Sequence, residues 1–323
     1  MKENKLLVGG QAVIEGVMMK GKKISVAVRK KDGEVVVRDY PTAIPIGSGW
    51  RKIPILRGVV VLWDALYTGI NVLGFSAQVA GDDVKLSKKD IIISILLAFG
   101  FGILLFSVLP LLLASIFSFI REDEFLFSLI EGIIRTVILL MYVWIIGFIP
   151  DIKRVFQYHG AEHKSVYTYE AGDELTVENA RKYSTLHPRC GTSFLMITMV
   201  AAIIVFSFLG VFGQLNFLER FLSRILLIPV IAGIAFEFQR FTAKYIKNPL
   251  VRIIALPGLL LQKLTTREPS DDQLEVALIA LKASLGLNWK SDVEVEENTD
   301  QNIDDKTYQT VSVEEKAKEI EQQ

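Results

Sequence analysis

Long apolar runs divide this chain, and four of them have the length of a membrane span. The runs cover residues 91–120, 126–149, 194–212 and 221–238. Each offers about twenty apolar residues, the number that an α-helix needs to cross the hydrocarbon core of a bilayer. Four such runs in one chain are not typical of the buried helices of a soluble domain. The pattern therefore predicts an α-helical multi-pass membrane protein with about four transmembrane helices.

Two further apolar segments do not fit a simple span. Residues 54–75 carry Arg57 and Asp64, which share one helical face and are unfavourable against lipid. We expect an interfacial helix here, or one tucked among the spans, within a unit of residues 51–80. Residues 249–264 are too short and too interrupted by proline to span. This segment is expected to lie on the membrane or to re-enter it.

Alternating apolar and polar residues near the start predict a small β region within residues 1–50. Residues 22–29 alternate as a half-buried strand does, and residues 34–39 provide the returning strand. Asp32 and Gly33 lie between them and form a two-residue hairpin signal. We therefore expect a small sheet, built around this β-hairpin, within residues 8–46.

Capping signals predict helices outside the spans. Residues 151–170 are expected to continue as a helix out of the membrane, and Thr176 can cap a short helix after it. Ser270 opens a capping box, and Gly286 marks the end of an amphipathic helix with an apolar stripe. The expected organisation is a membrane domain at 91–243 with a histidine hairpin at 150–193, interfacial and amphipathic helices at 244–288, and an acidic, disordered tail at 289–323.

Charge along the chain predicts its orientation. Apolar residues make up 51% of the sequence and the mean hydropathy is +0.37. The net charge is zero, but the tail from Ser291 holds eleven acidic residues and three lysines, so the remainder is basic. Lysine and arginine gather before the first run, between the second and third, and after the fourth, which places both termini and the histidine hairpin in the cytoplasm. Membrane lipids rather than nucleic acid are the partners that this basic excess indicates.

All three histidines and the single cysteine lie within 32 positions, between the second and third runs. The stretch from His159 to His163 reads H-x-x-E-H, one spelling of a zinc-hydrolase motif. On a helix both imidazoles lie on one face and can reach a single ion. Glu162 lies beside them and is the candidate general base toward metal-bound water. The motif alone is a weak signal, and the clustering is what favours a metal site.

Three residues are candidates to complete the ligand set. His187 and Cys190 add an imidazole and a thiol just before the third run. A cysteine at the start of a helix is exposed to backbone N–H groups, which favour the metal-binding thiolate. Glu170 stands seven residues beyond His163 on the same helical face and competes for the third position. The sequence leaves this choice open.

Two other carboxylates are further candidates. Glu15 lies among small and apolar residues and is a possible additional ligand, although a structural role in the sheet is the simpler interpretation. Glu237 lies near the end of the fourth run, where a carboxylate is costly. Its simpler interpretation is a pair with Arg240, one turn further on.

Five stretches of the sequence resemble a known family. They are GGQAVIEGVMM at 9–19, ILRG at 55–58, YHGAEHK at 158–164, HPRCGTSF at 187–194 and PGLLLQKLTTREP at 257–269. Over residues 8 to about 286 the chain resembles the YqhQ-like family of uncharacterised bacterial multi-pass membrane proteins, whose members are predicted metal-dependent enzymes. The resemblance implies a bacterial inner cell membrane and no particular substrate. It favours His159, Glu162, His163, His187 and Cys190 as site residues.

These observations favour a membrane-embedded enzyme that uses a divalent metal, zinc by ligand type, at the cytoplasmic interface. Hydrolysis of a lipid, a lipid-linked molecule or a membrane-protein segment is the expected reaction. The first alternative is a metal- or ion-handling transporter or sensor, with Glu131, Arg135 and Glu237 marking a path through the spans. The second is an assembly factor whose acidic tail binds a protein partner. A closed four-ligand site would favour a sensor, whereas an open position would favour the enzyme.

Overall fold

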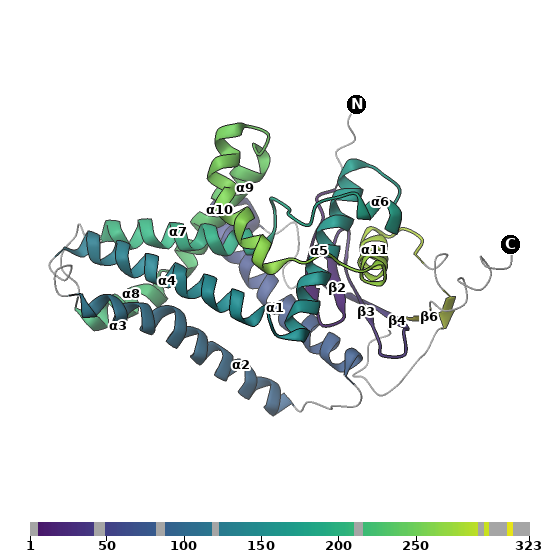
Figure 1. The fold of residues 1–323 in the computed structure, drawn as a ribbon, viewed down its shortest axis with the longest axis horizontal. Coiled ribbons are helices and arrows are strands. Elements are labelled where there is room, and N and C mark those ends of the chain that lie inside the picture. Colours follow the sequence, from purple (N-terminus) through teal and green to yellow (C-terminus); the bar gives the residue numbers. More distant parts are fainter. Residues whose placement is uncertain are drawn as a thin grey trace.

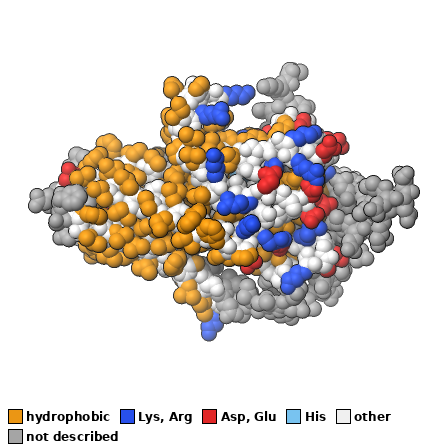
Figure 2. Space-filling model, in the orientation of Figure 1, with side chains coloured by type: hydrophobic (Ala, Val, Ile, Leu, Met, Phe, Trp, Pro, Cys, Tyr) orange, Lys and Arg blue, Asp and Glu red, His pale blue; other side chains and the backbone are white. Residues whose placement is uncertain are grey.

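The computed structural model describes residues 6–41, 49–81, 88–117, 123–209, 216–289, 294–296 and 309–312. Figure 1 shows an elongated bundle of helices beside a second part that is built on a β-sheet. Apolar side chains cover the bundle in Figure 2, whereas charged side chains gather over the sheet part. This division indicates a membrane domain joined to a unit that faces water.

Among the described residues, four helices are long and apolar enough to cross a membrane. They are α1 (Leu56–Ala80), the helix over Ile92–Ile116, α4 (Glu124–Ile146) and α7 (Gly191–Leu209). The second of these is built from α2 (Lys88–Ile103), a π-helical turn (Leu104–Val108) and α3 (Leu109–Ile116). The helical, multi-span character that the sequence predicts is thus present, and it indicates a membrane protein.

Two apolar segments form helices that differ from those expected from the sequence. Segment 54–75, expected to lie at the interface or tucked among the spans, belongs to α1, whose length and composition suit a span. The predicted span over 221–238 is instead divided between α8 (Phe217–Leu226) and α9 (Ile228–Lys244), which meet at a bend of 48°. Pro229 opens α9 and lacks the N–H that a continuous helix would require. This pair forms either a broken span or a re-entrant segment.

Buried ion pairs attach α8 to α4. The Nε atom of Arg224 lies 3.0 Å from Oε2 of Glu131, and Glu131 also pairs with Arg135. Near the start of α4, Glu124 pairs with Arg220. Buried charges are costly unless they are paired, so these contacts explain why the arginines of α8 face α4 while most of its large apolar side chains remain exposed. Glu131 and Arg135, which the sequence offered as an ion path, are therefore engaged with each other.

The sheet part begins with an antiparallel meander of β1 (Gly9–Val13), β2 (Gly16–Lys20), β3 (Ile24–Arg29) and β4 (Val35–Tyr40). The predicted hairpin is confirmed, and its turn contains Gly33 at φ 97°, a conformation that glycine adopts without strain. The turn between β1 and β2 contains Glu15 at φ 52°. Residues 42–46 of the expected sheet lie outside the described residues.

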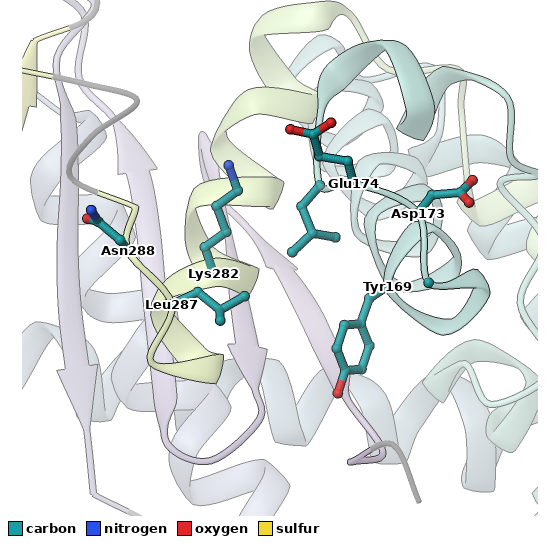
Figure 3. Close-up of a pocket in the computed structure, with 8 residues that line it drawn as sticks. Tyr169, Asp173, Glu174, Lys282, Leu287 and Asn288 are labelled. Atoms are coloured by element: carbon teal, nitrogen blue, oxygen red, sulfur yellow. The ribbon is translucent and has the colours of Figure 1, made fainter. Parts of the chain in front are cut away.

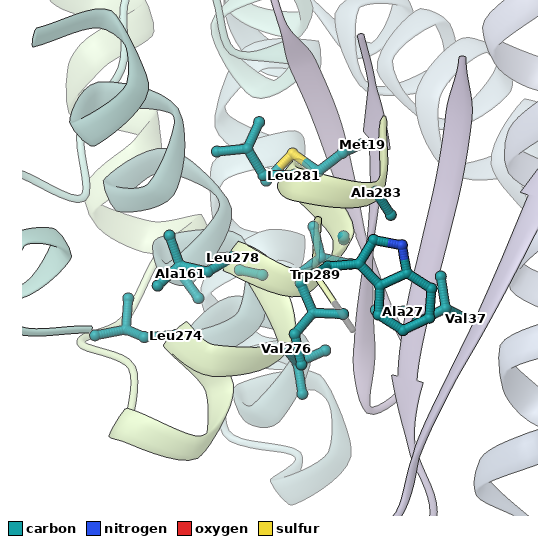
Figure 4. Packing of buried hydrophobic residues seen from close by; sticks show 14 of the residues in the cluster. Met19, Ala27, Val37, Ala161, Leu274, Val276, Leu278, Leu281, Ala283 and Trp289 are labelled. Carbon is teal, nitrogen blue, oxygen red and sulfur yellow. The ribbon is translucent and has the colours of Figure 1, made fainter. Parts of the chain in front are cut away.

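Helices cover both faces of this meander, so β3 is buried throughout most of its length rather than half-buried as its sequence pattern predicts. On one face, α11 (Asp271–Leu285) and α5 (Pro150–Ala171) pack against the strands, and Figure 4 shows Leu281 beside Met19 in that core. On the other face, α1 contributes Val72 and Phe75. The sheet is therefore the central layer of three.

The capping signals around residue 270 are confirmed in α11. The Ser270 side chain and the Gln273 side chain form a reciprocal capping box, and Gly286 ends the helix at φ 71°. The expected apolar stripe is buried, but so are small residues on the remaining faces, including Ala280, Ala283 and Ser284. The helix is thus enclosed, because the sheet and α5 surround it.

Two short strands extend the sheet beyond β4. Strand β6 (Gln309–Ser312) pairs with β4, and β5 (Glu294–Glu296) pairs with β6. The tail was predicted to be disordered over 289–323, and these two segments are instead ordered as strands. The other tail residues from 290 onward lie outside the described part of the chain.

Candidate metal centre

Helix α5 presents the first two candidate ligands. It begins at Pro150, which is favoured at a first helical position, and it ends at Gly172 with φ 88°. The helix predicted over 151–170 is therefore confirmed. His159 and His163 lie one turn apart on it, and their ring centroids are 4.4 Å from each other.

The segment after α6 (Val177–Arg181) returns to α5 and delivers the thiol. Cys190 directly precedes α7, and its sulfur accepts a hydrogen bond from the backbone N–H of Thr192 at 3.3 Å. The hydroxyl of Thr192 lies 3.0 Å from the same sulfur. Gln239 of α9 donates to the Cys190 carbonyl at 2.7 Å and fixes the backbone. The Thr192 contacts therefore fix the position of the sulfur at the start of α7.

His159, His163 and Cys190 converge. One nitrogen of each ring and the cysteine sulfur all lie within 4.8 Å of one another. His159 Nε2 lies 3.1 Å from Cys190 Sγ. Two imidazoles and one thiolate form a ligand set that suits zinc and related transition metals.

Backbone carbonyls fix the orientation of both imidazoles. His159 Nδ1 donates to the carbonyl of Thr265 at 2.8 Å, and His163 Nδ1 donates to the carbonyl of Thr185. A carbonyl oxygen can only accept, so in each neutral ring the proton is on Nδ1 and the lone pair is on Nε2. Metal-binding histidines are commonly held this way by a second hydrogen bond. The geometry therefore fits a bound cation.

His163 also lacks a hydrogen-bond partner where a metal would bind. Its Nε2 atom is buried and unpartnered, and only 1% of the residue is exposed. Burial lowers the pKa of His163, which keeps the ring neutral and its lone pair free. A buried polar atom without a partner is costly, and coordination to a cation would satisfy it.

His187 lies beside the three converging residues but not among them. Its ring is 5.7 Å from that of His163 between centroids. One ring nitrogen, Nε2, contacts Glu170 at 3.4 Å, and Nδ1 accepts from the Arg189 N–H at 3.4 Å. Glu170 itself forms an ion pair with Arg189. Burial lowers the pKa of His187 to about 4, so this ring is neutral at physiological pH.

Glu162 lies next to the histidines on α5 but contacts the sheet. It is only 7% exposed, and its Cγ atom would be 2.8 Å from a Cβ atom added to Gly10 of β1. Burial raises the pKa of Glu162, while the nearby His159 and His187 lower it. The close approach of the Glu162 side chain to β1 leaves no space for a side chain at position 10. Glu162 is not one of the three residues whose ligand atoms converge.

The other two carboxylate candidates have partners of their own. Glu15 pairs with Arg154, with Nε and Oε1 2.5 Å apart, and accepts from the Tyr158 hydroxyl at 3.3 Å. Glu237 forms an ion pair with Arg57 of α1, and the charge of Arg240, its predicted partner, also acts on it. These contacts assign Glu15 to the junction of sheet and α5, and Glu237 to the junction of α1 and α9.

Sequence reasoning missed the residues of α10 (Pro249–Thr265) that hold the centre together. Gln262 accepts from the His187 N–H at 2.7 Å and donates to the His187 carbonyl at 2.8 Å and to Ser193 at 2.6 Å. Thr265 supplies the carbonyl that orients His159. Both residues lie in the stretch 257–269 that carries the family resemblance, and this was the one signal that could have identified them.

A separate cavity of about 400 Å³ opens at the far end of α5. Figure 3 shows Tyr169, Asp173 and Glu174 on one side of it and Lys282 on the other. None of the candidate ligands lines this cavity. It is a feature of the sheet part and is distinct from the histidine cluster.

Comparison with known proteins places the chain in a family. The family described as "Protein of unknown function (DUF1385)" matches residues 53–287. The chain is 36% identical over 301 residues to "Uncharacterized protein YqhQ" of Bacillus subtilis (strain 168), covering 88% of this chain and 94% of that protein. No solved structure matches. The chain therefore belongs to the DUF1385 family and is a relative of YqhQ.

Proposed function

We propose that this protein is a membrane-embedded, metal-dependent enzyme with its site at the cytoplasmic membrane interface. His159, His163 and Cys190 would hold a divalent transition metal, with zinc favoured by the ligand types. The observation that carries this proposal is the convergence of one ring nitrogen from each of His159 and His163 with the Cys190 sulfur, all within 4.8 Å of one another. The buried, unpartnered Nε2 of His163 supports it further, because a cation would satisfy that atom.

An enzyme is favoured over a closed structural site by the number of ligands. Three protein ligands leave one position of a tetrahedral ion open, which is typical of catalytic zinc. His187 is disfavoured as a fourth ligand, because each of its ring nitrogens has another contact at 3.4 Å. A bound ion would contribute Lewis acidity, and Glu162 would carry the proton. Glu162 is buried and its pKa is raised, which suits a carboxyl group that transfers protons.

The location of the site limits the substrate. The lysine and arginine distribution favours a bacterial cell membrane orientation with both termini and the histidine hairpin in the cytoplasm. A site held between α5, α7 and α10 at the edge of the apolar bundle suits a lipid, a lipid-linked molecule or a membrane-protein segment. Hydrolysis is the simplest reaction for one metal ion and one carboxyl group.

A non-enzymatic metal sensor is the second candidate function. It is favoured by the depth of the cluster, because His163 is 1% and Cys190 is 6% exposed. A transport role has less support, since Glu131 and Glu237 are held in ion pairs with arginines. A sensor would bind metal tightly without turnover, and Glu162 would then be dispensable.

The test begins with the metal content of the full chain purified in detergent, measured by elemental mass spectrometry. About one equivalent of metal is expected in the wild type and none in His159→Ala/His163→Ala. Glu162→Gln should retain the metal and lose hydrolysis of membrane lipids, whereas a sensor would retain its metal response. Loss of metal in Glu162→Gln would make this residue a ligand. Wild-type protein that takes up no metal, even after reconstitution with zinc, would contradict the proposal.

A further inference from the structure

The hairpin of α9 and α10, residues 228–265 and here called the interfacial hairpin, has an apolar surface without protein cover among the described residues. Six large apolar side chains on it are between 46% and 70% exposed: Phe241, Leu250, Ile253, Ile254, Leu256 and Leu260. Such a continuous apolar surface is not stable in water and marks a binding surface. We therefore expect a partner that covers these apolar side chains with apolar groups of its own.

The charge of the same segment identifies the partner. Residues 228–265 contain five basic residues, Arg240, Lys244, Lys247, Arg252 and Lys263. Their one acidic residue, Glu237, forms an ion pair with Arg57 of α1. A second copy of this chain would bring like charges together and would be repelled. An anionic lipid leaflet offers acyl chains for the apolar side chains and phosphate groups for the basic ones.

The position of the hairpin agrees with this partner. In Figure 1, α9 and α10 project to one side, where the bundle meets the sheet part. Figure 2 shows apolar side chains on this projection continuing into the apolar surface of the bundle, with basic side chains among them. Helix α10 has 17 residues and contains Pro257, so it is too short to cross a bilayer. It can lie along the surface instead.

The far end of α10 holds the candidate metal centre. The Thr265 carbonyl accepts from His159 at 2.8 Å, and Gln262 binds both backbone groups of His187. Gly258 allows α10 to approach α7, since a Cβ atom there would lie 3.0 Å from Ser193 Cβ. Any force that positions α10 therefore also positions the imidazole of His159 and the backbone of His187.

We propose that the interfacial hairpin docks into an anionic lipid leaflet and that this docking holds α10 against the metal centre. Resting on the function proposed above, the inference identifies the substrate class as a membrane amphiphile with an anionic headgroup. Such a molecule would reach the site along α10 from the leaflet. The docking itself does not require the metal.

The docking is tested on metal-free, full-length protein in vesicles that contain phosphatidylglycerol and bromine-labelled lipid. Ile253→Trp places a fluorescent side chain on the hairpin, and Lys182→Trp places a matched one on the exposed surface near α6. Quenching of the added fluorescence is expected to be about two-fold or more greater for Ile253→Trp. Equal quenching of the two variants would overturn the docking. Equal quenching in vesicles with and without phosphatidylglycerol would overturn the preference for anionic lipid.

The link to the metal centre has a separate readout in the same vesicles. Thr266 N–H donates to Gln262 at 2.8 Å and Arg267 N–H donates to Phe156 at 2.9 Å, so both amides report on the end of α10. Ile253→Glu/Ile254→Glu should speed their hydrogen exchange several-fold, because carboxylates are repelled by the leaflet. Leu287→Glu, at a half-exposed residue outside the hairpin, should leave it unchanged. Unchanged exchange in the double variant would overturn the coupling.

The lipid docking and the proposed metal-dependent function can be contradicted independently of each other. If the quenching and exchange results contradict the docking, metal content and the effect of His159→Ala/His163→Ala are unaffected by that result. If the protein instead binds no metal, both lipid measurements can still be made, because they use metal-free protein.

Discussion

The Nε2 atom of His159 lies 3.1 Å from the Sγ atom of Cys190, although 31 positions separate the two residues in the chain. The contact joins the middle of α5 to the start of α7. His163 completes the triangle from the next turn of α5.

Cobalt substitution should separate the proposed ligands from their neighbours. Cobalt bound to the wild type is expected to show a sulfur-to-metal charge-transfer band, because Cys190 is one of the converging residues. Cys190→Ser should lose this band and bind the metal at least about ten-fold more weakly. The measurement is an absorption titration in detergent.

His187→Ala is the matched control for the cobalt experiment. It removes an imidazole from the same hairpin, but one whose ring nitrogens contact Glu170 and Arg189. The sulfur band should persist in this variant. Its disappearance would show that His187 is a ligand and would argue for a closed, four-ligand site.

Gly160 allows another segment to approach α5 closely. A Cβ atom at this position would collide with the carbonyl oxygen of Arg267, two residues after Thr265. Gly160→Ala should therefore displace the carbonyl that orients His159, destabilise the fold by about 1–3 kcal/mol and weaken metal binding. Thermal unfolding in detergent and zinc titration measure the two effects.

Gly74→Ala makes the same change in α1, where nothing lies within 4 Å of the added Cβ atom. There the substitution should be neutral or stabilising by up to about 1 kcal/mol, as alanine favours a helix. Gly160→Ala could lower the melting temperature and leave the affinity for zinc unchanged. That result would show that the close approach at Gly160 stabilises the fold but does not orient His159 for metal binding.

Gln262 should contribute more to stability than its position near the end of a helix suggests. Gln262→Met removes the partners of the His187 N–H, the His187 carbonyl and the Ser193 hydroxyl while keeping a similar volume. Leaving buried groups unpaired is expected to cost about 2 kcal/mol or more. The free energy of unfolding in mixed micelles tests this value.

Gln239→Met provides a graded comparison for that measurement. Gln239 donates one hydrogen bond, to the Cys190 carbonyl at 2.7 Å. Its loss should cost about 1 kcal/mol. If Gln262→Met and Gln239→Met have the same free energy of unfolding, the three hydrogen bonds of Gln262 contribute no more to stability than the one of Gln239.

Glu15→Gln should leave the metal content unchanged. The sequence made Glu15 a candidate ligand, but its carboxylate pairs with Arg154, whose side chain is 52% exposed. An ion pair this exposed contributes little to stability, so the expected cost is below about 1 kcal/mol. Elemental analysis of the variant provides the test, and a loss of metal would return Glu15 to the ligand set.

The sequence by itself determined the local elements and the candidate atoms. Apolar runs predicted the long helices, Asp32 and Gly33 predicted the hairpin, and Ser270 with Gly286 bounded α11. Residues at i and i+4 of a helix must share a face, so His159 and His163 were paired from spacing alone. These features depend on neighbours within a few positions, which a sequence displays directly.

Only the tertiary structure decided which distant groups meet. Nothing local separates Cys190 from His187 as the third member of the cluster, because both precede α7 and the choice depends on how the returning segment packs on α5. The Thr265 carbonyl and Gln262 approach from α10, more than seventy residues further along the chain than His187. Such contacts arise from packing between elements, and a helical or strand period contains no information about them.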